Sequence, residues 1–192
     1  VSVIDELPKG RKPIQTKLVE DKDRVHVYAH IDSLISQGQQ VYVVCPMISE
    51  SDKLGVKSVE TEYKILQNSV FKHRRIGLVH GRLKADEKAS IMNQFKQGKL
   101  DMLVATSVIE VGVDVPNATI MLIEGADRFG LAALHQLRGR VGRGDKQSHC
   151  YLFTSSDNPD TIKRLRALEK TTDGFRLAQI DLETRGPGEI YG

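Results

Sequence analysis

The sequence contains no tryptophan, and its 192 residues include only two cysteines, Cys45 and Cys150. Each cysteine lies inside an apolar, strand-like segment, where a small buried thiol is expected rather than a disulfide or a metal ligand. No apolar run approaches the length that spans a membrane, and no basic-then-apolar leader is present. These absences argue against secretion and membrane insertion, and they favour a reducing cytoplasm.

A phosphate-binding loop of the Gly-x-x-x-x-Gly-Lys-Ser/Thr type is also missing. The most similar segment, Gly98-Lys99, is followed by Leu100 and closes a predicted helix. The chain begins at Val1 rather than at a methionine, and residues 1–13 contain two prolines and a glycine, which is typical of a linker. We therefore expect a piece of a longer protein, with residues 1–13 as a linker from a preceding domain.

The composition is that of a globular protein, with 40% hydrophobic and 28% charged residues. The length suits one domain with an appendage better than two full domains. The predicted isoelectric point of 8.8 permits a nucleic-acid partner without demanding one.

Strand-like and helix-like segments alternate at a spacing of about 25 residues, which is typical of right-handed βαβ units. Apolar strands are predicted at 14–19, 40–47, 75–80, 101–105, 119–123 and 148–154, and helices at 24–37, 58–71, 85–97 and 130–138. The first helix is expected to turn Val25, Tyr28, Ile31 (or Ala29), Leu34 and Ile35 inward. The predicted fold is α/β: a three-layer parallel sheet with helices on both faces, over residues 14–156.

The last segment, residues 157–192, differs in character. A charged helix begins near Asn158, Gly174 interrupts it, and residues 181–189 are expected to form a loop bracketed by Gly and Pro. We interpret this segment as a helical hairpin appended outside the main core.

In parallel sheets, ligands gather at the carboxyl ends of the strands. Polar residues follow three of the predicted strands there: the segments 80–82, 106–116 and 124–128, of which the last leads to the arginine stretch described next. Thr106 and Ser107 could donate to phosphate oxygens, Gly112 would allow close backbone approach, and Asp114 could accept from a ribose hydroxyl. A simple turn before the next strand is the alternative for residues 114–116.

The most basic stretch is Gln-Leu-Arg-Gly-Arg-Val-Gly-Arg at residues 136–143. Arg138, Arg140 and Arg143, with two glycines between them, present planar guanidinium groups that match phosphate oxygens bidentately. They predict a site for a polyanionic phosphate, and the alternative is a solvated basic loop.

Three of these segments together resemble motifs of superfamily 2 helicases: the strand ending in His-Gly-Arg, then Ala-Thr-x-x-x-x-x-Gly-x-Asp-x-Pro, then Gln-x-x-Gly-Arg-x-Gly-Arg. The resemblance covers residues 14–155 and implies the second RecA-like domain of such a helicase. In that family, two RecA-like domains clamp ATP between them. The resemblance implies that ATP and Mg²⁺ are held mainly by a first domain that lies outside this chain, and that this chain holds no metal itself.

The resemblance also implies roles for single residues. Arg143 is similar to the arginine finger, Arg140 to its phosphate-contacting partner and Gln136 to a residue that orients them, while Gly112 and Asp114 correspond to nucleotide contacts. The implied contacts to the DNA backbone are Thr106, Ser107, Gly81 and Arg82.

The tail, with Asp173-Gly174-Phe175 and Arg185-Gly186-Pro187-Gly188, resembles the translocation motif shared by the RecG family and the transcription-repair coupling factors. The linker and Pro187 favour the RecG family. Arg185, and Arg128 ahead of the arginine stretch, would then couple nucleotide-driven closure to movement of DNA.

Membership of the RecG family would imply a monomeric bacterial cytoplasmic enzyme that remodels stalled forks and branch-migrates Holliday junctions in DNA repair and recombination. It would act together with its other RecA-like domain and a wedge domain, and without a membrane. The chain alone would hydrolyse no ATP. Two alternatives stay open: the corresponding domain of a coupling factor, whose partners include RNA polymerase, and a non-catalytic nucleic-acid-binding module.

Overall fold

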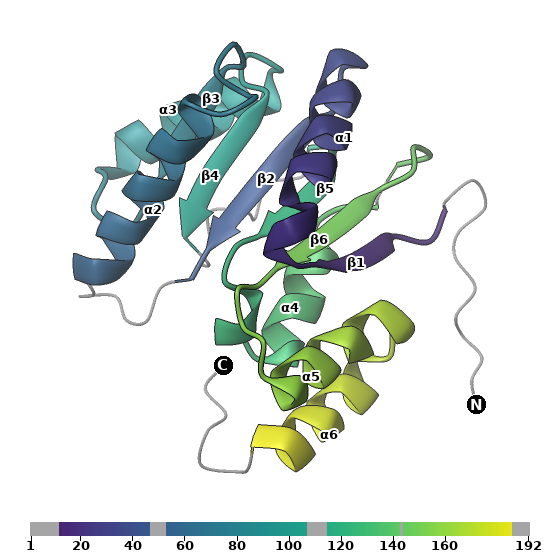
Figure 1. The fold of residues 1–192 in the computed structure, drawn as a ribbon. Coiled ribbons are helices and arrows are strands. Elements are labelled where there is room, and N and C mark those ends of the chain that lie inside the picture. The colour runs from purple at the N-terminus through teal and green to yellow at the C-terminus, as the bar shows by residue number, and fades with distance from the viewer. Residues whose placement is uncertain (1–11, 47–52, 107–114, 143, 186–192) are drawn as a thin grey trace.

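The computed structural model describes residues 12–46, 53–106, 115–142 and 144–185, and it contains a single six-stranded sheet (Figure 1). All five strand pairings are parallel, in the order β1-β6-β5-β2-β4-β3. The strands are β1 Gln15–Val19, β2 Gln40–Cys45, β3 Ile76–Val79, β4 Met102–Thr106, β5 Ala118–Ile123 and β6 His149–Phe153. The predicted parallel sheet is confirmed.

Helices cover both faces of this sheet, as predicted. One face packs against α1 (Arg24–Ser36) and α2 (Lys53–Gln67), and the other against α3 (Ala85–Lys96), α4 (Leu131–Arg138) and α5 (Pro159–Lys170). A sixth helix, α6 (Gly174–Arg185), lies beside α4 and α5, and short 3-10 turns occupy Asp21–Asp23 and Ala126–Arg128.

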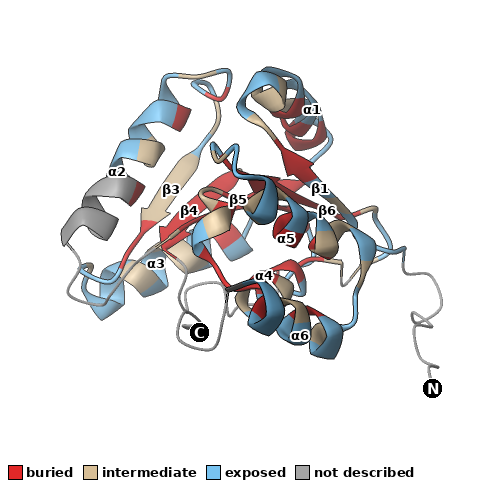
Figure 2. Cartoon of the chain, turned by 60° about the horizontal axis from the view of Figure 1, so that its bottom comes forward, coloured by how far each residue is buried: buried red, intermediate tan, exposed pale blue. Residues whose placement is uncertain are grey.

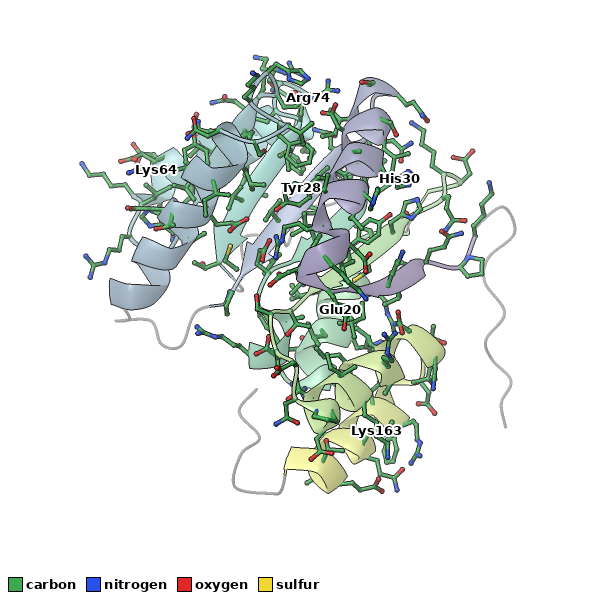
Figure 3. The ribbon with its side chains drawn as sticks, viewed as in Figure 1. Glu20, Tyr28, His30, Lys64, Arg74 and Lys163 are labelled. Atoms are coloured by element: carbon green, nitrogen blue, oxygen red, sulfur yellow. The ribbon has the colours of Figure 1, made fainter. Side chains whose placement is uncertain are left out.

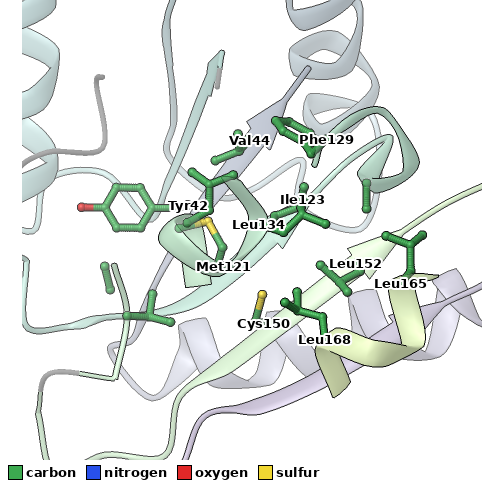
Figure 4. Close-up of a cluster of buried hydrophobic side chains, with 14 of the residues drawn as sticks. Tyr42, Val44, Met121, Ile123, Phe129, Leu134, Cys150, Leu152, Leu165 and Leu168 are labelled. Carbon is green, nitrogen blue, oxygen red and sulfur yellow. The ribbon is translucent and has the colours of Figure 1, made fainter. Parts of the chain in front are cut away.

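The central strand β2 explains why the strands appear continuously apolar in sequence. Its side chains alternate between the two layers: Val41 and Val43 pack with the α1 and α2 side, whereas Tyr42 and Val44 pack with the α3 to α5 side. Figure 4 shows the second of these clusters, where Tyr42 meets Met121 and Leu134. Every position of the strand is buried, as the colouring of the sheet in Figure 2 illustrates.

The two cysteines lie on opposite faces of the sheet, and both are free and buried. Burial raises the pKa of the Cys150 thiol to about 12. Both thiols therefore stay protonated at neutral pH and pack as small apolar groups, as the sequence predicts.

The inner face of α1 differs from the prediction by one residue. Val25 is 76% exposed and Val27 is buried in its place, beside Tyr28 and Ile31 as expected. Arg24, the first residue of the helix, bonds to Tyr28 on the same helix and to Glu124 just after β5, so this end of α1 is tied to the sheet.

The terminal helical pair is part of the main core, so its predicted position outside that core was wrong. Leu165 and Leu168 of α5 and Leu177 of α6 are completely buried in the same cluster as the sheet (Figure 4 labels the first two). Residues 181–185 were expected in a loop but belong to α6. Gly174 begins this helix rather than breaking one, because the Asp173 carboxylate accepts from the amides of residues 175 and 176.

A buried ion pair joins this helical pair to α4. Arg164 of α5 donates to the carboxylate of Asp181 on α6 (3.3 Å) and to the backbone oxygens of Asp127 and Phe129. The other oxygen of Asp181 accepts from the amide of Leu131, the first residue of α4, at 2.6 Å. The residue before α4 is Gly130, which has no side chain to cap the helix, so Asp181 supplies the cap from another helix.

Strands β1 and β3 form the two edges of the sheet. On β1 the amide of Leu18 donates to a carboxylate oxygen of Glu169 on α5, at 2.8 Å. Arg166 holds the other oxygen of Glu169, at 3.0 Å. The Leu18 amide points away from β6, and the Glu169 side chain accepts its hydrogen bond in place of a neighbouring strand.

Replacing Asp181 tests the contribution of the helical pair to the core. Asp181→Ala removes the cap of α4 and leaves Arg164 buried without its carboxylate, so we expect the free energy of unfolding to fall by about 3 kcal/mol. Urea unfolding followed by circular dichroism measures this change. Glu183→Ala, an exposed acid on the same helix, serves as control and should change stability by less than about 0.5 kcal/mol. Equal stability of the two variants would contradict the cap.

Candidate functional site

The arginine stretch lies at the amino edge of the sheet, opposite the carboxyl edge where segment 124–128 leads into α4. Gly142 has φ +85°, and a Cβ on it would lie 2.7 Å from Ile14, the residue before β1. The Lys146 ammonium lies 3.5 Å from the Asn117 side chain, just before β5. The physical reason is that α4 is a crossover between parallel strands, which must return the chain from the carboxyl edge to the amino edge.

The three arginines of the stretch are not equivalent. Arg138 is buried and donates to the carbonyl oxygens of Leu168 (2.6 Å) and Thr171 (3.0 Å), where α5 ends. The free carbonyls at a helix end carry partial negative charge, so they stabilise the guanidinium although burial lowers the pKa of Arg138. Arg138 is therefore a structural residue, which the sequence alone did not distinguish from its neighbours.

Gln136 lies in the last turn of α4 and Arg140 lies two residues beyond its end, and both side chains are exposed. Among the residues that the structure describes, no carboxylate pairs with Arg140. Both side chains lie at the surface of the amino edge. Arg143, Gly112 and Asp114 lie outside the described residues. Two residues after Asp114, the carbonyl oxygen of Pro116 lies 3.9 Å from the position that a Cβ on Gly144 would take. The segment that follows Asp114 thus borders the arginine stretch.

The predicted DNA contacts lie at the carboxyl edge. Thr106 ends β4, pairs with Cys45 of β2 and is buried, and its hydroxyl has no hydrogen-bond partner in the described part of the chain. Gly81 and Arg82 follow the neighbouring strand β3 and are exposed. The structure brings these three residues to neighbouring strand ends, whereas Ser107 lies outside the described residues.

Arg128 is exposed in the 3-10 turn after β5, at the same carboxyl edge. It lines a cavity of about 340 Å³ at the ends of β2, β5 and β6. The backbone of Arg185 ends α6, and its side chain lies outside the description.

Besides Arg128, the charged side chains that line this cavity are Arg24, Glu62, Glu124 and Asp127. Sequence analysis pointed to segment 124–128 but missed Arg24 and Glu62. Both terminal nitrogens of Arg24 donate to the Glu124 carboxylate, and its Nη1 also donates to the Tyr28 hydroxyl (2.9 Å). The guanidinium carbon of Arg24 lies 4.4 Å from the centre of the Phe153 ring. Figure 3 shows Tyr28 on the side of α1 that faces α2. Only the position of Glu124 directly after β5 was a usable signal, because Arg24 and Glu62 come from distant helices.

Three carboxyl groups line the cavity, those of Glu62, Glu124 and Asp127, and Arg24 pairs with Glu124. Desolvation by burial, followed by the charge of Glu124, raises the pKa of Glu62 to about 7. The Oε1 atom of Glu62 is buried and has no hydrogen-bond partner among the described residues. Glu62 is therefore partly protonated at neutral pH.

Residues 25–145, more than half of the chain, match the family described as the helicase conserved C-terminal domain. The chain belongs to this helicase family. The ATP-dependent DNA helicase RecG of Synechocystis sp. is 51% identical over the whole chain, which spans 23% of that relative, and RecG of Thermotoga maritima is 50% identical, with 25% of its length covered. The chain thus spans about a quarter of the length of these relatives.

Solved structures of helicases agree with this assignment. A structure of RecG bound to a three-way DNA junction has a TM-score of 0.78 and 46% sequence identity, and the match covers 97% of this chain and 24% of that one. Domain 2 of the DEAD-box helicase Mss116p, bound to an RNA duplex, has a TM-score of 0.61 at 23% identity over 82% of this chain and 60% of that one, and it supports the fold alone. The RecA-like fold predicted from the sequence is confirmed.

In the described residues, no group of three or more His, Cys, Asp or Glu side chains is placed to hold a metal ion. Within the same ranges, no helix is long and apolar enough to cross a membrane.

The raised pKa of Glu62 predicts a pH-dependent stability. Between about pH 4.5 and pH 7 the folded chain keeps a proton that the unfolded chain releases, so the free energy of unfolding falls as the pH rises through this window. Glu62→Gln cannot ionise and should lose this fall. Its stability relative to the parent should increase by on the order of 2 kcal/mol from pH 4.5 to pH 8, after allowance for partial exposure of the carboxyl.

Urea unfolding at a series of pH values measures this difference, and Glu183→Gln, an exposed acid on α6, is the matched control. A parent and a Glu62→Gln variant whose stabilities run parallel across the range would show that Glu62 titrates normally.

Proposed function

We propose that this chain is the second motor domain of a RecG-type, ATP-dependent DNA helicase that acts on branched duplex DNA. The observation that carries the proposal is the identity of about 50% to RecG proteins over the entire chain. The relatives with this identity are named RecG, so a coupling factor or a non-catalytic module is not favoured.

The amino edge is the proposed nucleotide side. Arg140 and Arg143 would reach an ATP held by a first motor domain and offset the negative charge that the phosphoryl group carries during transfer. Gln136, exposed on α4, would help to orient them, and Gly112 and Asp114 would contact the nucleotide. The exposure of Arg140 without a described carboxylate fits this role.

The chain contains no phosphate-cradling loop of its own, so ATP and Mg²⁺ would be held mainly by the first domain. The nucleotide supplies the phosphoryl group and the metal neutralises part of its charge. This chain by itself is expected to be inactive.

The carboxyl edge is the proposed DNA side. Thr106, Ser107, Gly81 and Arg82 would contact the sugar and phosphate backbone of one strand, which gives affinity without sequence readout. The buried Thr106 hydroxyl without a described partner is consistent with a missing ligand atom near the end of β4.

Helix α6 would connect the two edges. A Cβ on Gly174, at its start, would lie 3.0 Å from the ring of His135 near the end of α4, whereas Asp181 near its end bonds Leu131 at the start of α4. The helix therefore runs the length of α4 from the nucleotide side to the DNA side. Arg185 at its end and Arg128 at the carboxyl edge are proposed to couple domain closure to a DNA step.

The whole protein would remodel stalled forks and branch-migrate Holliday junctions in DNA repair and recombination. Its wedge domain and first motor domain would belong to the same longer chain, with residues 1–13 as the linker and residues 157–192 as the translocation motif. We propose a monomer in the bacterial cytoplasm, in keeping with the bacterial origin of the RecG relatives.

The phosphate role of the arginines predicts a loss of turnover without a loss of DNA binding. In the full-length protein, Arg140→Ala and Arg143→Ala should each lower DNA-stimulated ATP hydrolysis by about a thousandfold or more, because each removes charge stabilisation of the transition state. The affinity for a fork substrate should change less than about threefold. Lys99→Ala, an exposed cation elsewhere in the chain, is the control. Survival of turnover in both arginine variants would refute the assignment.

The DNA role of Arg82 predicts a change in salt dependence. Arg82→Ala should weaken binding to all duplex sequences alike and should reduce the slope of log K against log salt concentration by about one, since one phosphate contact is lost. Fluorescence anisotropy of the full-length protein with a labelled fork measures the slope. Lys99→Ala should leave the slope unchanged, and an unchanged slope in Arg82→Ala would exclude the contact.

A further inference from the structure

The outward side of α6 is apolar. Phe175 is 86% exposed and Leu182 is 50% exposed, and their separation of seven positions places both side chains on one side of the helix. Ala178, one turn after Phe175, is exposed on the same side. The opposite side carries Leu177, which is completely buried against the core. Figure 2 shows exposed positions along α6 on the side away from the sheet.

This helix differs from the others in having two apolar sides. Among the described residues, the large exposed hydrophobic side chains are Val25, Ile65, Val70, Phe175 and Leu182. The first three are single residues on or beside α1 and α2, whereas the last two form a common surface. A helix that is apolar on opposite sides is typical of a helix covered on both, and a soluble surface seldom presents an aromatic ring this exposed without a partner.

The position of this surface indicates what covers it. Gly174 lies against His135, and the next residue of α4 is the exposed Gln136, which leads to Arg140. The end of α6 that carries Phe175 therefore borders the arginine stretch. A domain that brings a nucleotide to Arg140 must approach this same end of α4.

We propose that the outer face of α6, formed by Phe175, Ala178 and Leu182, is a docking surface for the nucleotide-holding motor domain of the full-length protein. This inference rests on the proposed function and adds an apolar anchor to it. The RecG relatives are about four times the length of this chain, so the occupant belongs to the same polypeptide. Contacts between arginines and phosphates lose hydration when they form, which offsets much of their contribution to the free energy of association. Burial of a Phe ring contributes to that free energy through its apolar area.

Photo-cross-linking in the full-length protein tests the occupant. Phe175→p-benzoylphenylalanine keeps an aromatic ring in place, and Val25→p-benzoylphenylalanine, on the other face of the sheet, is the control. With a non-hydrolysable ATP analogue and fork DNA, position 175 should cross-link to the domain that contains the phosphate-binding loop, and position 25 should not. A cross-link to the wedge domain, to a second copy of the chain, or to nothing would overturn the proposal.

A binding measurement separates this inference from the proposed function. Phe175→Ser in the full-length protein should weaken binding of the ATP analogue by about tenfold and raise the KM for ATP similarly, with kcat at saturating ATP nearly unchanged. Val25→Ser should change neither. Arg140→Ala should instead lower kcat. If Phe175→Ser matches the parent while Arg140→Ala abolishes turnover, the docking surface is wrong and the motor function stands. If the full-length parent shows no DNA-stimulated ATP turnover, the motor function itself fails.

Discussion

The contact on which the functional half of the molecule depends is the carboxylate of Asp181 at the start of α4. It caps a helix that has no cap of its own, and Arg164 both neutralises it and binds the turn that precedes the helix. At the other end of α4, Arg138 is held by the carbonyls where α5 ends. The terminal helical pair thus fixes both ends of the helix that carries the arginine stretch, which makes it part of the same folding unit rather than an accessory to it.

The parallel topology determines how the candidate site is divided. A crossover helix between parallel strands must begin at the carboxyl edge and end at the amino edge. Arg128 and Arg140 are only twelve residues apart, yet they lie at opposite edges of the sheet because α4 separates them. One edge can therefore face a nucleotide while the other faces DNA, and α4 and α6 are the rigid elements between them.

The sequence was sufficient to predict the sheet, its helices and the family, because these depend on hydrophobic period and on motifs that are local in the chain. It did not reveal that Arg138 is structural, since that depends on carbonyls thirty residues away, nor did it reveal the pairing of Arg24 with Glu124 across a hundred residues. Val25 was placed inward because it is apolar and precedes Tyr28 by three residues, but at 100° per residue Val27 lies within the buried arc and Val25 lies outside it. Residues 157–192 were separated from the core because their charged surface conceals three buried leucines. The roles assigned to the site residues all stay predictions, and Arg143, Asp114 and Gly112 also lie outside the described part of the structure.

The side chain of Glu169, which reaches from α5 to the edge strand β1, limits the pairing of a further strand with the sheet. Unpaired backbone donors on an edge strand invite a further strand, from another domain or another molecule, to extend the sheet. With the Leu18 amide already bonded and Glu169 itself anchored by Arg166, a strand added there would have to displace a charged pair. The pairing of a further strand with β1 is therefore disfavoured at Leu18.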